Sequence, residues 1–186
     1  MKKQLALALS KIFIAYYKVR YVKKIHFGKS VIINHKFKVS GPGQLFIGDN
    51  VNLWAHEEPN SFNFYHKSAV IKVGANSRLN GLTCHCAESI EIGDNCLIGS
   101  SSIMDTDFHT FDDPDHILYG NPKVKSVKIG NQVWLCGQSA ILKGCLIGNH
   151  SVVGFRAVVT KSFPENVVIA GNPAKVVKSK GNALII

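Results

Sequence analysis

The chain has 186 residues, 46% of them hydrophobic, and a formal net charge of +10 at pH 7. This length favours one domain, and this apolar content suffices for a continuous core. The odd number of cysteines, five, argues against a disulfide framework and favours free thiols in a reducing cytoplasm. Residues 1–48 hold ten Lys or Arg and no Asp or Glu, whereas the rest carries twelve charges of each sign. All of the excess charge therefore belongs to the N-terminal quarter.

Residues 4–22 are predicted to form an amphipathic helix. Gln4, Lys11 and Lys18 are seven residues apart and form a narrow polar strip, and apolar side chains cover most of the remaining surface. A cation costs about 3 kcal/mol at mid-bilayer, which argues against a membrane-spanning helix. Two compatible roles remain: a cap on the first turn of the fold, and peripheral contact of residues 1–40 with an anionic membrane. No basic motif with interleaved aromatic residues follows, so nucleic acid is not an expected partner.

Most of the chain after this helix follows a six-residue repeat. Aliphatic residues recur every six positions from Ile129 onward, and small residues or glycines stand at fixed offsets from them. The aliphatic positions are Ile129, Leu135, Ile141, Ile147, Val153 and Val159. A second run contains Cys86, Ile92, Ile98 and Met104. This period fits neither a helix nor a simple alternating strand, but it fits short strands joined by tight turns that need small residues. Stacked units of this kind predict a parallel β-helix.

The repeat is interrupted between Met104 and Ile129, which are 25 residues apart, one more than four repeats. The interruption predicts an extruded loop over residues 105–126, and such excursions usually carry function. If the chain leaves the coil in an extended conformation, Asp105, Asp107 and His109 project from one face, so that a carboxylate could orient the imidazole. The imidazole could then remove a proton from a hydroxyl near neutral pH.

At these residues the chain resembles the hexapeptide-repeat acyltransferases, and within them the acetyl-CoA-dependent sugar O-acetyltransferases of the galactoside, maltose and polysaccharide-biosynthesis types. The resemblance covers roughly residues 45–180. It rests on these segments: Ile92-Gly93-Asp94-Asn95, Asp105-Thr106-Asp107-Phe108-His109, Val133-Trp134, Val152-Val153-Gly154, and Val167 to Lys175 with its Gly171-Asn172-Pro173-Ala174-Lys175 ending.

The resemblance implies a left-handed coil, although the usual right-handed preference of parallel crossovers would predict the opposite. It also implies a homotrimer with active sites between subunits, acetyl-CoA as acyl donor and His109 as general base. Direct attack by a sugar hydroxyl on the thioester then needs no acyl-enzyme and no metal. Backbone N–H groups could stabilise the oxyanion.

Other site residues follow from the same resemblance. Trp134 and Gly154 would border the cofactor, and Asn80 would lie near the acetyl group. The remaining residues implied at the cofactor are Lys161, Gly171, Asn172, Pro173 and Lys175, with Lys178 as a further phosphate partner. Cys136 and Phe155 stand where the family usually has small residues, which predicts a cofactor groove of different shape. No arginine lies between His109 and Trp134 to bind the acceptor, as it does in many polysaccharide relatives.

Several alternatives stay open at this point. Asp105 and Asp107 could simply cap turns, and Trp134 could be a packed wall residue. Residues 112–115 lack the spacing of a calcium loop. In Cys84-His85-Cys86, alternation puts His85 opposite both cysteines, which favours packing over a metal site. A zinc carbonic anhydrase using His85, His109 and His116 is less favoured, as is a noncatalytic scaffold. Among acyltransferases, N-acetylation of an amino sugar or a xenobiotic is the alternative.

The sequence therefore predicts an all-β, left-handed parallel β-helix with an N-terminal α-helix and an extruded loop. We expect residues 1–28 to form the basic helix and connector, residues 29–170 the β-helix, and residues 171–186 a tail beside the cofactor. The expected activity is acetyl transfer to a sugar hydroxyl in capsule, O-antigen or exopolysaccharide biosynthesis. The expected location is the cytoplasm, peripherally at the inner face of the membrane, because the acidless N-terminal quarter favours a lipid-linked glycan acceptor.

Overall fold

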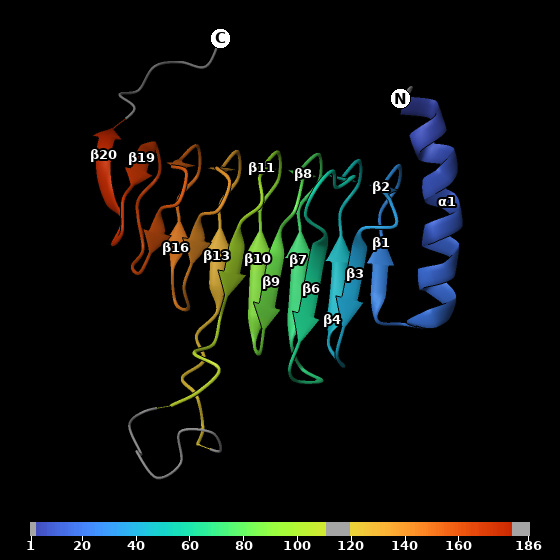
Figure 1. The fold of residues 1–186 in the computed structure, drawn as a ribbon, viewed down its shortest axis with the longest axis horizontal. Helices are drawn as coiled ribbons and strands as arrows, with labels where there is room; N and C mark the ends of the chain where they lie inside the picture. The colour runs from blue at the N-terminus through green and yellow to red at the C-terminus, as the bar shows by residue number, and fades with distance from the viewer. Residues whose placement is uncertain (1–2, 111–119, 180–186) are drawn as a thin grey trace.

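The structure, a computed structural model, describes residues 3–110 and 120–179 as one α-helix followed by a coil of short strands (Figure 1). The helix α1 (Lys3–Arg20) crosses one end of the coil. The strands stack into three sheets, A, B and C; each turn from β1 to β18 contributes one strand to each sheet, and β19 and β20 extend sheet B alone. All strand pairs of these three sheets are parallel except the last, in which β19 pairs antiparallel with β20. The predicted parallel β-helix with an N-terminal helix is therefore confirmed.

The strands are two to five residues long, and within each sheet they are stacked along the coil axis in chain order. Sheet A contains β1 (Ile25–Phe27), β4 (Gln44–Ile47), β7 (Val70–Val73), β10 (Ser89–Ile92), β13 (Val127–Ile129) and β16 (Leu146–Ile147). Sheet B contains β2 (Ile32–Ile33), β5 (Asn52–Leu53), β8 (Arg78–Leu79), β11 (Leu97–Ile98), β14 (Trp134–Leu135), β17 (Val152–Val153), β19 (Val167–Ala170) and β20 (Lys175–Ser179). Sheet C contains β3 (Phe37–Ser40), β6 (Asn60–Phe64), β9 (Thr83–Cys86), β12 (Ser102–Met104), β15 (Ala140–Ile141) and β18 (Val158–Val159).

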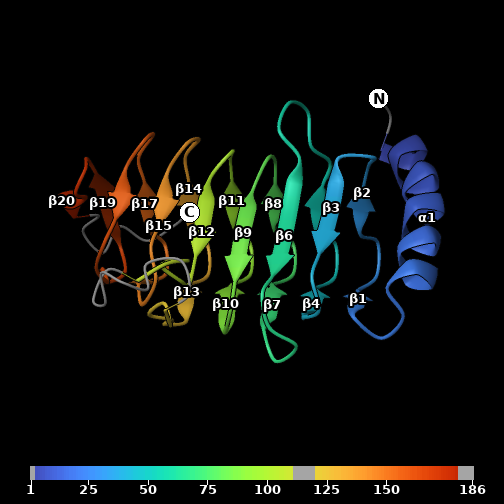
Figure 2. The same cartoon turned by 60° about the horizontal axis from the view of Figure 1, so that its bottom comes forward.

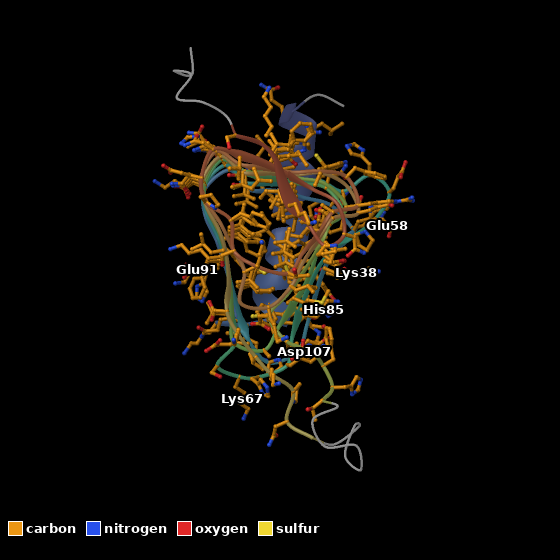
Figure 3. All side chains as sticks on the ribbon, turned by 90° about the vertical axis from the view of Figure 1, so that its left-hand side faces the viewer. Lys38, Glu58, Lys67, His85, Glu91 and Asp107 are labelled. Carbon is orange, nitrogen blue, oxygen red and sulfur yellow. The ribbon has the colours of Figure 1, made fainter. Side chains whose placement is uncertain are left out.

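The aliphatic positions of the six-residue repeat form the interior of the coil. Ile129, Leu135, Ile141, Ile147, Val153 and Val159 are all at most 1% exposed. Figure 3 looks along the coil and shows the three walls around this core. Each inward residue stacks on its equivalent in the next turn, as Ile98 does on Leu135. Strands of two residues are long enough for a stable coil because the stacking of inward side chains between turns, rather than strand length, buries the apolar surface.

The corner between sheets A and B explains why the glycine that follows a sheet A strand is usually followed by Asp or Asn. Asn131 Oδ1 accepts a hydrogen bond of 2.8 Å from the Asp94 N–H in the preceding turn. A Cβ on Gly93 would overlap Asn131 Oδ1 and the backbone of Gly130, so only glycine fits beneath this side chain. Two residues after Gly93, Asn95 has a φ of 57°, a left-handed conformation that asparagine tolerates better than most residues. The stacking of turns therefore fixes this part of the repeat.

The helix α1 closes the first turn of the coil, as one of the two expected roles requires. The buried Ser10 Oγ accepts a hydrogen bond of 3.0 Å from the Ile33 N–H and lies 2.8 Å from the Ile33 carbonyl oxygen. The Tyr17 hydroxyl donates to the Phe37 carbonyl, and the Tyr21 hydroxyl donates to the Val39 carbonyl at 2.7 Å. These bonds satisfy polar groups at the edge of the solenoid. Within the described residues, no helix is long and apolar enough to cross a membrane.

Candidate active site

The loop that interrupts the repeat leaves the corner between sheets C and A, after β12 (Figure 1). Its two described arms run antiparallel at the base. The Asp107 N–H donates to the Lys123 carbonyl at 3.2 Å, and the Lys125 N–H donates to the Asp105 carbonyl at 2.8 Å. Glu88 Oε2 accepts hydrogen bonds of 2.9 and 2.8 Å from the N–H and hydroxyl of Ser126. The base of the loop is thus held to the coil on both sides.

Asp105 anchors the outgoing arm and faces the coil. Its side chain is fully buried, and its carboxylate accepts backbone N–H bonds of 2.7, 2.8 and 2.8 Å from Ala87, Glu88 and Ser89. The Cys86 thiol adds a contact of 3.5 Å. The expectation that Asp105 projects on one face with Asp107 and His109 is therefore wrong. The carboxylate is turned inward because the corner of the preceding turn presents three N–H donors that have no strand partner.

Asp107 and His109 lie on the exposed side of the loop. Asp107 Oδ1 forms a 2.5 Å ion pair with Lys143 Nζ, from the equivalent corner one turn later. Between them, Phe108 has a φ of 63°, and the His109 N–H donates to the Asp107 carbonyl at 2.7 Å. This tight turn separates His109 from the arm that carries Asp107. The Asp107 carboxylate is therefore paired with Lys143. His109 is exposed.

An aromatic cluster that the sequence analysis missed supports this turn. The Tyr65 hydroxyl and His85 Nδ1 share a hydrogen bond of 2.8 Å. The Phe108 ring meets the rings of His85 and Tyr65 edge-on, with centroids 5.1 and 5.6 Å apart. Burial lowers the pKa of His85 and raises that of Tyr65, so both are neutral at neutral pH. In Figure 3, His85 and Asp107 lie near the corner of the coil from which the loop extends. The register Asn63↔His85 and Met104↔His85 would have indicated this proximity once the strand pairing was known.

The Cys84-His85-Cys86 segment has the predicted alternation. Cys84 and Cys86 are fully buried, whereas His85 faces outward toward Tyr65. All five cysteines are free thiols, and burial raises the pKa of every one of them. A raised pKa disfavours the thiolate, which is the nucleophilic form. The described residues contain no cluster of metal-binding side chains, and His116 lies outside them.

The residues expected at the cofactor lie elsewhere, along the corner between sheets B and C. Backbone hydrogen bonds of 2.7–2.9 Å from each turn to the next connect this corner, which we call the B–C row: Asn80, Gly99, Cys136, Gly154 and Ala170. Trp134 lies beside the row on the outer face of sheet B and is 48% exposed. Asn80 Oδ1 accepts a hydrogen bond of 2.9 Å from the His56 N–H.

The row ends at the turn between β19 and β20. Gly171 has a φ of 97°, its carbonyl accepts from the Val158 N–H at 3.0 Å, and the Asn172-Pro173 peptide bond is cis. Ala174 is buried, and Lys175 begins β20, whose side chains are all exposed, including Lys178. Lys161 follows β18 at the other corner of sheet C and contacts the Phe163 ring at 5.7 Å. The structure therefore brings the Gly171–Lys175 turn to the B–C row but leaves Lys161 apart from it.

The two positions that depart from the family pattern lie within this row. The exposed Phe155 ring sits over Gly137, 3.6 Å from where a Cβ on that glycine would be. The Arg156 guanidinium lies 5.1 Å from the centre of this ring, and Arg156 Nε donates to Gln138 Oε1 at 2.6 Å. Cys136 is half-buried beside them. A fixed aromatic ring thus occupies surface that a small residue would leave open.

The site residues predicted from the sequence therefore form two groups. Asp105, Asp107 and His109 lie at the corner between sheets C and A, whereas Asn80, Gly154 and Gly171 lie at the corner between sheets B and C. The sheet between them includes the segment from Gly99 to Asp105, which spans about 20 Å when extended. A separate groove of about 960 Å³ follows the Gly-Asx corner and sheet A, lined by Phe46, Glu91 and Asp94 among others. None of the predicted site residues lines that groove.

Comparison with known proteins fits this arrangement. No family model matches the chain. Over 138 residues the chain is 33% identical to the galactoside O-acetyltransferase of Escherichia coli K12, an alignment that covers 73% of this chain and 64% of that protein. Over 99 residues it is 40% identical to WbbJ of the same strain, named for O-acetyl transfer in lipopolysaccharide biosynthesis, covering 49% of this chain and 50% of that protein. The chain is thus similar to sugar O-acetyltransferases over about three quarters of its length.

The chain spans between half and two thirds of the length of these two relatives. Its coil also matches solved structures. The polysialic acid O-acetyltransferase OatWY is 28% identical, with a TM-score of 0.63 over 84% of this chain and 74% of that chain. The hexapeptide-repeat acetyltransferase VCA0836 of Vibrio cholerae, solved with acetyl coenzyme A, is 21% identical, with a TM-score of 0.63 over 96% of this chain and 83% of that chain. The coil agrees with the left-handed parallel β-helix that the resemblance implies.

Proposed function

We propose that the protein transfers an acetyl group from acetyl-CoA to a sugar hydroxyl in surface polysaccharide biosynthesis, with His109 as general base. The observation that carries the proposal is the placement of His109. It is exposed at the end of a loop arm that Asp105, Asp107 and the Phe108 cluster hold at the interruption of the repeat. Similarity to galactoside and lipopolysaccharide O-acetyltransferases supports a sugar hydroxyl as acceptor.

In the proposed reaction, the His109 imidazole accepts the proton of the sugar hydroxyl as that oxygen attacks the thioester carbonyl carbon. The carbonyl electrons move onto oxygen, where backbone N–H groups stabilise the charge. Collapse of this intermediate breaks the carbon–sulfur bond, and the imidazolium returns its proton to the leaving CoA thiolate. The products are the acetyl ester and free CoA. The raised pKa of all five thiols supports this direct transfer over a cysteine acyl-enzyme.

We propose that acetyl-CoA lies along the B–C row, with the pantetheine arm beside Trp134 and the phosphates near Lys175 and Lys178. The exposed indole of Trp134 and the exposed edge strand β20 leave this surface accessible in the described chain. Phe155 narrows the row, so the arm would pass its ring instead of crossing Gly137 directly. Lys161 would contribute only from another subunit or by long-range attraction, because it lies at the other corner of sheet C.

The separation of the two groups of residues supports a homotrimer with active sites between subunits. A base must come within hydrogen-bonding distance of the proton that it removes. A thioester held on the B–C row of one chain lies across sheet C from that chain's own His109. A neighbouring subunit could bring its loop to the row, and complete the site. Asn80 would then meet the acetyl group at the far end of the row.

Subunit mixing tests this arrangement. His109→Ala lacks the base, and Gly154→Trp would block the row at a position where a Cβ already meets Ala170 Cβ at 3.3 Å. If sites lie between chains, trimers refolded from both inactive variants regain part of the wild-type rate, because some sites combine an intact loop with an intact row. Refolding either variant alone is the control. A monomer in light scattering, or mixtures as inactive as each parent, would refute the shared site.

Mass spectrometry of glycans incubated with the protein and acetyl-CoA tests the activity itself. We expect acetylated product whose acetyl group is removed by mild alkali, as an ester is and an amide is not. His109→Ala should lower kcat by about 10²–10⁴ while CoA affinity is retained. Alkali-resistant product would favour the N-acetyltransferase alternative, and full activity of His109→Ala would remove the base from this residue.

We also propose that residues 1–40 make peripheral contact with an anionic membrane at the cytoplasmic face. The support is electrostatic: this segment carries basic residues and no acidic ones, and basic residues near an anionic lipid surface each contribute about 1 kcal/mol. A lipid-linked glycan would then be the acceptor presented to the enzyme.

A further inference from the structure

The helix α1 has a second apolar face that the cap does not use. Ala6 and Ser10 are buried, and Phe13, Ile14 and Tyr17 pack against the core, so these residues form the inner face. A neighbouring, solvent-facing side carries exposed apolar side chains at alternating intervals of four and three residues: Leu5 (53% exposed), Leu9 (37%), Ile12 (68%), Tyr16 (59%) and Val19 (78%). We call these five residues the outer stripe. Positions with this spacing share one side of a helix.

Such a stripe is not needed to fold the coil. The inner face already supplies the hydrogen bonds of Ser10, Tyr17 and Tyr21 to the first turn. Contiguous apolar surface on an otherwise solvated helix marks an interaction site. The helix lies across the end of the coil, perpendicular to its axis, and Figures 1 and 2 agree on this placement. The outer stripe therefore lies on the solvent-exposed side of this end helix, away from the first turn of the coil.

The charges around the stripe indicate which surface it contacts. Lys11, Lys18 and Arg20 on the helix, with Lys23 and Lys24 after it, are all exposed, and no acidic residue occurs before Asp49. Pairing with the helix of a second copy would bring two such cationic surfaces together, which like-charge repulsion disfavours. A helix with one apolar face, basic flanks and modest net hydrophobicity is typical of segments that lie in the plane of an anionic membrane interface.

We propose that the outer stripe inserts into an anionic lipid surface and that the coil stands upright on it, with its axis along the membrane normal. This inference rests on the proposed function and deepens its membrane contact. In a trimer whose coils run parallel, three helices would lie at the same end and bind together. Linked contacts of this kind strengthen binding without any new contact type.

The upright orientation sets the distance between the lipid and the His109 loop. Three steps along sheet C, from β3 to β12, cover about 14 Å at the spacing of neighbouring strands. The helix adds its diameter of about 10–12 Å, so the loop leaves the coil about 25 Å from the outer stripe. Insertion of the stripe by about 5–10 Å still leaves the loop well above the headgroups. The acceptor is thus a lipid-linked glycan of several sugar units, because a single sugar on a lipid phosphate would stay near the headgroups.

Vesicle co-sedimentation of the full-length protein tests the docking surface. The probes are phosphatidylcholine vesicles with and without phosphatidylglycerol. Leu5→Gln/Ile12→Gln/Val19→Gln replaces three apolar side chains that are 53–78% exposed, and Gln keeps helix propensity. We expect about a tenfold or larger loss of affinity for the anionic vesicles. Val176→Gln/Val177→Gln, on exposed positions of β20 at the opposite end of the coil, is the matched control and should bind as wild type.

Each result of this experiment decides the proposal. Wild type that ignores anionic vesicles, or a triple variant that binds them equally, overturns it. A triple variant with a smaller assembly in light scattering shows that the stripe pairs subunits, which also overturns it. Acetyl transfer to a water-soluble glycan should be unchanged in the triple variant. An inactive wild type that still binds vesicles through the stripe would refute the proposed function while leaving the docking surface intact.

Neutron reflectometry of the protein on a supported phosphatidylglycerol-containing bilayer tests the orientation. Seven steps along sheet B plus the helix give an upright layer about 45 Å thick. A layer of that thickness supports the upright coil. A markedly thinner layer would mean that the coil lies on its side, and the argument for an extended acceptor would fail with it.

Discussion

At the scale of single residues, the loop depends on Asp105 more than on any residue that faces solvent. One buried carboxylate accepts three backbone N–H bonds from Ala87, Glu88 and Ser89. Local sequence could not reveal this, because the three donors lie 16–18 residues earlier in the chain. Alternation would place Asp105 and Asp107 on one side of an extended chain, but Asp105 is buried and Asp107 is exposed. The Asp105-Thr106-Asp107-Phe108-His109 segment resembles a catalytic motif, but its first residue, Asp105, has a structural role.

Asp105→Ala should destabilise the protein by about 3 kcal/mol or more, because it leaves buried N–H donors without an acceptor. Chemical denaturation followed by circular dichroism measures the change in the free energy of unfolding. Asp107→Ala is the control: its ion pair with Lys143 is partly exposed, so its loss should cost about 1 kcal/mol or less. Equal effects of the two substitutions would contradict the structural role of Asp105.

His85 gives stability a pH dependence with a defined sign. Burial lowers its pKa in the folded chain below the ordinary value of 6.5. The unfolded chain therefore binds this proton first as pH falls, and the stability that neutral His85 contributes is lost between pH 6.5 and the folded value. The stability advantage of wild type over His85→Gln should shrink across that window. Denaturant titrations of both proteins at neutral and mildly acidic pH measure it, and a constant difference would show that His85 does not titrate there.

At the scale of elements, the corners of the coil decide which glycines are required. A Cβ on Gly93 would meet the Asn131 side chain and the Gly130 backbone, and neither can move without disturbing the next turn. Gly93→Ala should therefore cost about 1–3 kcal/mol of stability. A Cβ on Gly137 meets only the Phe155 ring at 3.6 Å, an ordinary contact, so Gly137→Ala is the matched control. Thermal denaturation should separate the two, and an equally stable Gly93→Ala would disprove the steric account.

The same corners show why the repeat could be predicted from the sequence, whereas the geometry of the site could not. Every turn repeats one set of contacts, so Ile129 and its successors report the fold directly. The sharp turn at Phe108 depends instead on Tyr65 and His85, which reach it from two earlier turns. Lys143 reaches Asp107 from a later one. Such contacts join residues that share a corner rather than a local pattern, and they become visible only when the turns are stacked in register.

At the scale of the whole molecule, the coil is a one-dimensional stack whose ends are its weak points. Each turn contacts mainly its neighbours, so a loss at one end need not spread to the other. The C-terminal end is extended by the antiparallel β20, and the N-terminal end is covered by α1. The basic helix therefore has a structural role in addition to the proposed membrane contact. Removing it entirely would expose the buried Ile33 and Phe37, which confuses the two roles.

Ser10 separates the cap from the outer stripe, because it lies on the inner face of α1. Its buried Oγ accepts a hydrogen bond from the Ile33 N–H at 3.0 Å and lies 2.6 Å from the Ala6 carbonyl and 2.8 Å from the Ile33 carbonyl, which share its single proton. Ser10→Ala should leave the Ile33 N–H without its acceptor, at a cost of about 1–3 kcal/mol, and loosen the first turn. Hydrogen exchange measured by mass spectrometry should then quicken in β1–β3 and remain unchanged in β13–β18, since opening of a solenoid is local. Uniformly faster exchange along the coil would mean instead that α1 stabilises the molecule as one cooperative unit.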